Sequence, residues 1–95
     1  MSLEKQLLAN IRRNQSRQQT FDRMQERLIF ANSGGLWQAT PEFISFVHAL
    51  DTDHAVVADV DNTPRLVNPR ELLELARSQY QYAMNAWLAE WKKYE

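Results

Sequence analysis

The sequence predicts an α+β fold that is mainly helical, with a long helix at each end of a single domain that spans residues 1–95. Three observations predict it. The first thirty or so residues contain neither proline nor glycine. Two helix-start signals, Thr40-Pro41 and Asn68-Pro69, follow later in the chain. Between them, two short apolar runs flank the turn-forming stretch Asp61-Asn62-Thr63-Pro64.

The first predicted helix runs from Ser2 to about Ala31. The segment is rich in Leu, Gln, Arg and Glu, which are good helix formers. We interpret Asn32-Ser33-Gly34-Gly35 as its end, because glycine adopts the left-handed conformation that closes many helices. Leu36-Trp37-Gln38-Ala39 is then expected to be a short connector.

A short helix is predicted to begin at Pro41. Thr40 can cap it, proline suits the first helical position, and the carboxylate of Glu42 opposes the helix macrodipole. The apolar residues that continue it at helical spacing are Phe43, Phe46, Val47 and Leu50. The same stretch is rich in aromatic and β-branched residues, so a strand over residues 43–50 remains the alternative.

A β-hairpin and a second long helix are predicted to complete the fold. Residues 55–60 and 65–67 form the two short apolar strands, on either side of the turn. Asn68-Pro69-Arg70-Glu71 then supplies a cap, a first-turn proline and a carboxylate three residues after the cap. The last helix is therefore expected to run from Pro69 to near the C-terminus.

Aromatic side chains gather on one face of the last predicted helix. At about 100° per residue, one stripe contains Leu73, Ala76, Tyr80, Met84, Trp87, Trp91 and Tyr94. From Tyr80 onward the steps alternate between four and three residues, which is the spacing of a coiled-coil seam. Such a seam requires another helix.

The first predicted helix has a matching pattern. Its positions at alternating steps of four and three are Leu7, Ile11, Asn14, Gln18, Phe21, Gln25 and Leu28. The amides among them would cost stability in a buried seam but can fix its register. The commoner alternative is that the middle of this helix is simply solvated.

The two predicted long helices, of about 45 and 40 Å, have more apolar surface than a short helix and a hairpin can cover. Either they pack along each other, or their far ends project and are buried against a second subunit. We therefore predict a homo-oligomer, most simply a two-fold dimer, that acts as a scaffold or adaptor. The expected interface or core residues are Leu7, Ile11, Phe21, Leu28, Tyr80, Met84, Trp87 and Trp91.

The charge balance favours no polyanionic partner. Eleven basic and twelve acidic residues leave a formal net charge of −1, which argues against wholesale electrostatic capture of nucleic acid or membrane. Arg12, Arg13 and Arg17 could still contact phosphates, so nucleic-acid binding through the first helix is the first alternative function. Acidic residues share that helix and no sequence-reading motif accompanies the arginines, so a solvated face is the simpler interpretation.

Histidine and aspartate residues cluster around the predicted hairpin: His48, Asp51, Asp53, His54, Asp59 and Asp61. Asp59-Val60-Asp61-Asn62 resembles the opening of a calcium loop. However, Pro64 stands where the sharp-turn glycine belongs, and the closing glutamate is missing. Metal-dependent activity near His48 and His54 is the second alternative function. We expect no cofactor and no catalytic centre, since no nucleophile lies beside a base in a known frame.

The N-terminus predicts a cytoplasmic protein that is not secreted. Its first residues are polar and charged, with neither a secretory apolar region nor a run long enough to cross a bilayer. The absence of cysteine fits a reducing compartment.

Three stretches of the chain carry a resemblance. They are Asn10-Ile11-Arg12-Arg13-Asn14-Gln15 with Phe21-Asp22-Arg23-Met24-Gln25, Ala39-Thr40-Pro41-Glu42, and Tyr80-Gln81-Tyr82-Ala83-Met84-Asn85-Ala86-Trp87. Together they resemble a family of small uncharacterised proteins encoded by contractile-tailed phages of marine cyanobacteria, over most of the chain. The resemblance implies no catalytic residue or ligand. It implies a phage accessory or virion-associated protein, for which an oligomeric adaptor is a reasonable role.

Overall fold

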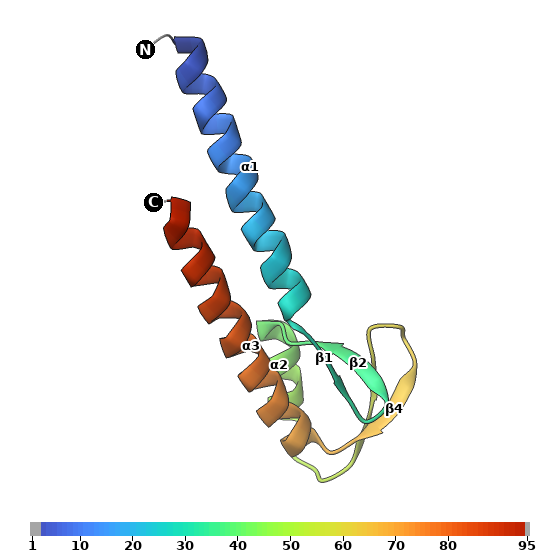
Figure 1. Ribbon diagram of the computed structural model, residues 1–95. Helices are drawn as coiled ribbons and strands as arrows, with labels where there is room; N and C mark the ends of the chain where they lie inside the picture. The colour runs from blue at the N-terminus through green and yellow to red at the C-terminus, as the bar shows by residue number, and fades with distance from the viewer. Residues whose placement is uncertain (1–2, 95) are drawn as a thin grey trace.

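Two long helices run antiparallel to each other, and two small β-hairpins and a short helix surround one end of the pair (Figure 1). The computed structural model describes residues 3–94, and of Arg13 and Tyr94 the backbone alone. The elements are α1 (Leu3–Arg27), β1 (Ile29–Asn32), β2 (Gly35–Gln38), α2 (Pro41–Ala49), β3 (Ala55–Ala58), β4 (Pro64–Val67), α3 (Pro69–Trp91) and a final 3₁₀ turn (Lys92–Tyr94). This arrangement confirms the predicted α+β, mainly helical class. The predicted first helical residue, Ser2, lies outside the described residues.

The segment after α1 differs from the prediction. The helix ends at Arg27 rather than Ala31, and the expected helix stop and connector form a hairpin in which β1 pairs antiparallel with β2. Ser33 and Gly34 have φ angles of 53° and 78°. A two-residue type I′ turn requires positive φ at both of its central positions. Gly34 is thus left-handed as predicted, but in a hairpin turn and not at a helix end.

Trp37 explains why the hairpin replaces the last turn of the predicted helix. Its side chain is 1 % exposed, and its indole Nε1 donates a hydrogen bond to the carbonyl of Asn32 at 2.9 Å. A buried tryptophan removes on the order of 200 Å² from water. The pairing of β1 with β2 points this side chain into the core while Ile29 and Leu36 stay outside.

The two proline-based helix starts are confirmed. The side chain of Thr40 accepts a hydrogen bond from the backbone N–H of Phe43 at 3.1 Å, which caps α2. The side chain of Asn68 accepts from the N–H groups of Arg70 and Glu71 at 3.0 and 3.3 Å, which caps α3. Residues 41–49 are therefore helical, and the strand alternative for residues 43–50 is wrong.

The second hairpin is confirmed, with strands slightly displaced from the prediction. Its first strand ends at Ala58 rather than Val60, because the buried carboxylate of Asp59 organises the turn. Oδ1 of Asp59 accepts from the N–H groups of Asp61 and Thr63 at 2.9 and 3.0 Å. Oδ2 accepts from Nε of Arg65 at 3.2 Å. These bonds hold the pKa of the Asp59 carboxyl below its usual value, with the Thr63 N–H as the largest cause.

The two hairpins lie against each other. The backbone N–H of Val60 donates to the carbonyl of Leu36 at 3.0 Å. Gly35 is buried, and a Cβ atom there would lie 3.0 Å from Oδ2 of Asp59. A larger residue at position 35 would therefore push the turn of the second hairpin away from the first.

Among residues 3–94, the buried core lies at the end of the molecule that carries the hairpins. One cluster joins the C-terminal part of α1 to α3, and its buried residues are Met24, Leu28, Ala39, Ala76 and Ala83. The other joins both hairpins to α2 and α3, and its buried residues are Trp37, Val47, Val57, Val67 and Leu72.

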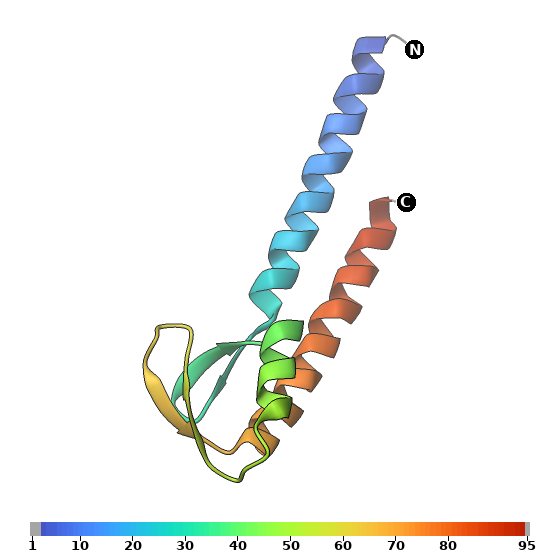
Figure 2. The same ribbon diagram turned by 180° about the vertical axis from the view of Figure 1, so that it is seen from behind.

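The molecule is long for its size. Its radius of gyration is 18.1 Å and its extents are 62 × 22 × 19 Å, whereas a compact chain of this length has a radius of about 12 Å. The N-terminal half of α1 accounts for the excess, because it continues well past the C-terminal end of α3 (Figures 1 and 2).

Candidate self-association surface

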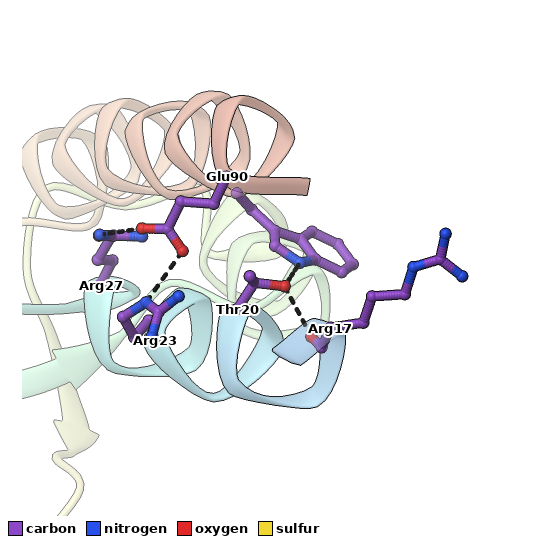
Figure 3. A network of polar contacts seen from close by, with 6 residues as sticks. Arg17, Thr20, Arg23, Arg27 and Glu90 are labelled. Carbon is purple, nitrogen blue, oxygen red and sulfur yellow. Dashed lines mark hydrogen bonds and ion pairs between the residues drawn. The ribbon is translucent and has the colours of Figure 1, made fainter. Parts of the chain in front are cut away.

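A carboxylate between two guanidinium groups aligns α1 with α3. Glu90 on α3 accepts from Nε of Arg23 at 3.0 Å and from Nη2 of Arg27 at 2.6 Å (Figure 3). The bond from Arg27, and then that from Arg23, hold the pKa of the Glu90 carboxyl below its usual value. The same bond raises the pKa of Arg27. Both arginines of this part of α1 are thus engaged within the chain.

Thr20 anchors the tryptophan at the next level of the helix pair. Its fully buried hydroxyl donates to the carbonyl of Arg17 at 2.6 Å and accepts from the indole Nε1 of Trp87 at 3.2 Å. The ring of Phe21 meets Trp87 edge to face, with centroids 5.8 Å apart. Trp87 is therefore fixed in one orientation although it is only half-buried.

Trp91 is the last residue of α3. Its ring meets that of Trp87 edge to face with centroids 6.3 Å apart. The guanidinium of Arg17 lies 4.7 Å from its centroid, a cation–π contact. Arg17 thus marks the level on α1 at which α3 ends.

Residues 3–14 of α1, which we call the arm, extend beyond this level. Every described side chain of the arm is exposed. The exposed fractions of its four large apolar side chains, Leu3, Leu7, Leu8 and Ile11, lie between 51 % and 71 %. Leu3, Leu7 and Ile11 follow one another at four-residue spacing and therefore share one face of the helix.

Two adjacent hollows lie on one flank of the α1–α3 pair. A hollow of about 270 Å³ is lined by α3 alone, through Met84, Trp87, Leu88 and Trp91. A hollow of about 350 Å³ is lined by Asn14, Arg17, Gln18 and Phe21 of α1, together with Trp87 and Trp91. Since they share both tryptophans, we treat them as one feature, the flank groove.

The spacing of the lining residues is that of helix packing. On each helix they stand at positions i, i+3, i+4 and i+7. Four residues at this spacing form the hole that receives one side chain of a neighbouring helix in knobs-into-holes packing. The residues of the flank groove therefore have the spacing at which a third helix packs.

The residues predicted for the interface or core divide into two groups. Leu28 is buried in the chain's own core, and Tyr80, Met84 and Trp87 pack against that core while partly exposed. The other group stays available at the surface, and its members are Leu7, Ile11, Phe21 and the half-buried Trp91. The structure brings Phe21, Trp87 and Trp91 together. It leaves Leu7 and Ile11 beyond the end of α3.

Of the two arrangements that the sequence left open, the structure shows the packing of the long helices along each other, over part of their length; burial of a projecting end against a second subunit stays a prediction. The C-terminal half of α1 packs along α3, and the arm projects past it (Figure 2). Sequence reasoning missed Leu88, which is exposed and lines the flank groove. The signal for it was its position four residues after Met84. The side chain of Tyr94, the last residue of the predicted stripe, lies outside the described residues.

The arginines proposed to contact phosphates occupy different settings. Arg12 is exposed on the arm, while Arg17 is half-buried over Trp91. The side chain of Arg13 lies outside the described residues.

The histidine and aspartate residues of the predicted cluster are dispersed. His48 on α2 lines a cleft of about 510 Å³ against α3, with Nδ1 3.4 Å from Nη2 of Arg77. Asp59 holds the hairpin turn, and Asp53 pairs with Arg70 at 3.3 Å. Among residues 3–94, no three histidine, aspartate or glutamate side chains come together in a way that could hold a metal ion.

Comparisons with other proteins assign no family. The chain has no significant match among protein-family models, curated proteins or solved structures. Within residues 3–94, no helix combines the length and the apolar character needed to cross a membrane. The arm and the flank groove are therefore the features of the chain that bear on its function.

Proposed function

We propose that this chain is a non-enzymatic interaction domain that self-associates, most simply as a two-fold dimer, and serves as a scaffold or adaptor. The observation that carries the proposal is the apolar arm, whose leucine and isoleucine side chains have no helix beside them. Monomeric proteins rarely expose contiguous apolar patches larger than a few hundred Å². Burying the arm against another chain removes this surface from water.

A second copy of the same chain suits the arm better than an unrelated partner. The arm offers an apolar helical ridge and the flank groove offers holes at helical spacing, and both belong to every copy. A two-fold arrangement uses each surface twice, once in each direction. The formal net charge of −1 leaves little overall repulsion between two copies.

The resemblance to phage proteins would give such a domain its setting. An adaptor that forms a small symmetric unit would join or space other components of a virion, or would act as an accessory to its assembly.

The test is the mass of the protein in solution. Light scattering or sedimentation equilibrium at high micromolar concentration is expected to give twice the mass of the chain. The double variant Leu7→Asp/Ile11→Asp is expected to give the mass of one chain. Its circular dichroism should remain helical, because neither side chain contributes to the core.

A matched control comes from the second hairpin. Val56 and Leu66 are a cross-strand pair and are 68 % and 65 % exposed, so they are more accessible than Leu7 and Ile11. The double variant Val56→Asp/Leu66→Asp should keep the wild-type mass. A wild-type protein that is a monodisperse monomer at high micromolar concentration would refute the proposal. If the hairpin variant dissociates while the arm variant keeps the mass of two chains, the association surface lies on the hairpins and not on the arm.

A further inference from the structure

We infer that the two copies pair antiparallel through α1 about a two-fold axis at Asn14, so that Leu7 of each copy enters the flank groove of the other. This inference rests on the proposed self-association and adds its geometry. The partner is a second copy of this chain, and each flank groove is incomplete without the arm of the other copy.

Contacts between α1 and α3 show which of their residues lie at the same height along the helix pair. Trp91 lies beside Arg17, and Trp87 lies beside Thr20 and Phe21. The α3 part of the flank groove therefore stands level with Phe21, and Trp87 is one of the residues that line it.

Asn14 lies midway in the sequence between Leu7 and Phe21, since Leu7 precedes it by as many residues as Phe21 follows it. In an antiparallel pair centred on Asn14, Leu7 of the second copy thus stands opposite Phe21, beside the hole lined by Met84, Trp87 and Leu88. The apolar part of the arm and the apolar hole then meet at the same height without any adjustment.

Other registers lose this match. A parallel pair places arm against arm and groove against groove, which leaves every hole without a side chain to fill it. A slipped antiparallel pair separates the two Asn14 amides, which otherwise hydrogen-bond to each other across the axis. A polar residue at a single seam position selects register in this way.

The lengths of the helices also fit. Within one copy, α3 stops at the level of Arg17, three residues short of Asn14. The second copy has the same geometry, so the two α3 helices end at levels about 9 Å apart along the α1 pair, at 1.5 Å per residue. The two α3 helices do not overlap, and the 3₁₀ turns that follow them (Lys92–Tyr94), which each add about 6 Å at about 2 Å per residue, meet near the axis. The result is a two-fold assembly in which each half is a bundle of three helices, α1 and α3 of one copy with α1 of the other, and a compact head stands at each end.

Disulfide trapping tests the register, because the chain has no cysteine of its own. Asn14→Cys should form a covalent dimer under mild oxidation. Leu7→Cys alone should not, because the two copies of position 7 would be about 21 Å apart along the axis, beyond the reach of a disulfide. An equimolar mixture of Leu7→Cys and Phe21→Cys should give the mixed disulfide, and this pair leaves Asn14 intact.

A control on the same helix measures random collision. Gln19 is exposed and points about 140° away from Asn14 at 100° per residue, so Gln19→Cys should link at least tenfold more slowly than Asn14→Cys. Equal rates for the two variants would overturn the inference. Rapid linking of Leu7→Cys without the mixed disulfide would establish a parallel pair, which overturns the register and leaves self-association standing. A wild-type mass of one chain would remove the proposed function and the register together.

Discussion

Apolar side chains are buried at one end of the molecule and exposed at the other. At the hairpin end, Trp37 and Leu72 are almost completely buried among residues from β2, α2, β3, β4 and α3. At the arm, Leu7 and Ile11 are more than half exposed and contact no core cluster. The hairpin end therefore supplies the folding stability of the single chain. The arm, which is a lone helix there, depends on helix propensity and, under the proposed self-association, on the second copy.

The largest expected effect tests the hairpin end. Trp37→Ala should lower the free energy of unfolding by about 3–5 kcal/mol, because it leaves a large cavity in the core. Denaturant unfolding at low protein concentration measures this change. Leu36→Ala, at the exposed neighbouring position, should change it by about 0.5 kcal/mol or less. Similar losses for the two variants would contradict the conclusion that burial of Trp37 stabilises the hairpin end.

The next effect tests the joint between the two ends, by which we mean the contact of Thr20 on α1 with Trp87 on α3. Thr20→Val removes the hydroxyl that accepts the indole N–H of Trp87, and the cost of the unsatisfied donor is about 1–3 kcal/mol. Thr20→Ser keeps the hydroxyl and should cost less. Denaturant unfolding followed by tryptophan fluorescence measures both variants. A valine variant as stable as the wild type would show that the hydrogen bond between Thr20 and Trp87 contributes nothing to the free energy of unfolding.

Acid should weaken the hairpin end and the contact between α1 and α3 by a smaller amount. Asp59 in the hairpin turn and Glu90 between the helices have folded pKa values below their ordinary values of 3.8 and 4.5. The unfolded chain therefore binds more protons near pH 4, and stability falls as the pH drops below about 5. Urea midpoints between pH 7 and pH 3 measure the fall. Glu90→Gln and Asp59→Asn should each make it shallower, and a fall unchanged in both variants would contradict this assignment.

The smallest effect on folding is expected in the arm. Leu7→Ala should change the free energy of unfolding of the dilute chain by less than about 0.5 kcal/mol, because the side chain is exposed in the single molecule. The same variant should weaken association by about tenfold, equivalent to about 1.4 kcal/mol. Sedimentation equilibrium measures the second quantity. A large loss of folding stability without any change in association would reverse the roles of the two ends.

The sequence was sufficient where the determining interactions are local. The starts of α2 and α3 follow from Thr40 and Asn68, whose side chains cap N–H groups two or three residues away. The stripe on α3 follows from helical periodicity alone. These predictions needed no knowledge of what lies next to each helix.

The first hairpin was missed because its local signals are shared by two structures. Ser33-Gly34 with positive φ suits a helix end as well as a hairpin turn. The apolar residues from Leu28 onward also continue the helical pattern. The burial of Trp37 against α2, β3, β4 and α3 decides between the two, and that contact joins residues far apart in the chain. The usable signal was the pair of short runs that favour strands, Ile29-Phe30 and Leu36-Trp37, on either side of Ser33-Gly34.

The candidate surface was predicted only in part for the same reason. Leu7, Ile11, Phe21 and Leu28 belong to one periodic series, yet Leu28 is buried in the core and Leu7 is exposed. Periodicity identifies the face of a helix but not the level at which a neighbouring helix ends. That level depends on how the first hairpin and α2 position α3, so the boundary between core and arm could not be predicted from the spacing.

Glu90 has a consequence for any assembly built from this chain. The two guanidinium groups that it contacts stand one helical turn apart on α1, so a shift of α3 in either direction along α1 stretches one of the two bonds. The overhang of α1 past α3 is thereby held constant from copy to copy. A carboxylate that need not touch a neighbour would in this way determine the distance between the two heads of a paired unit.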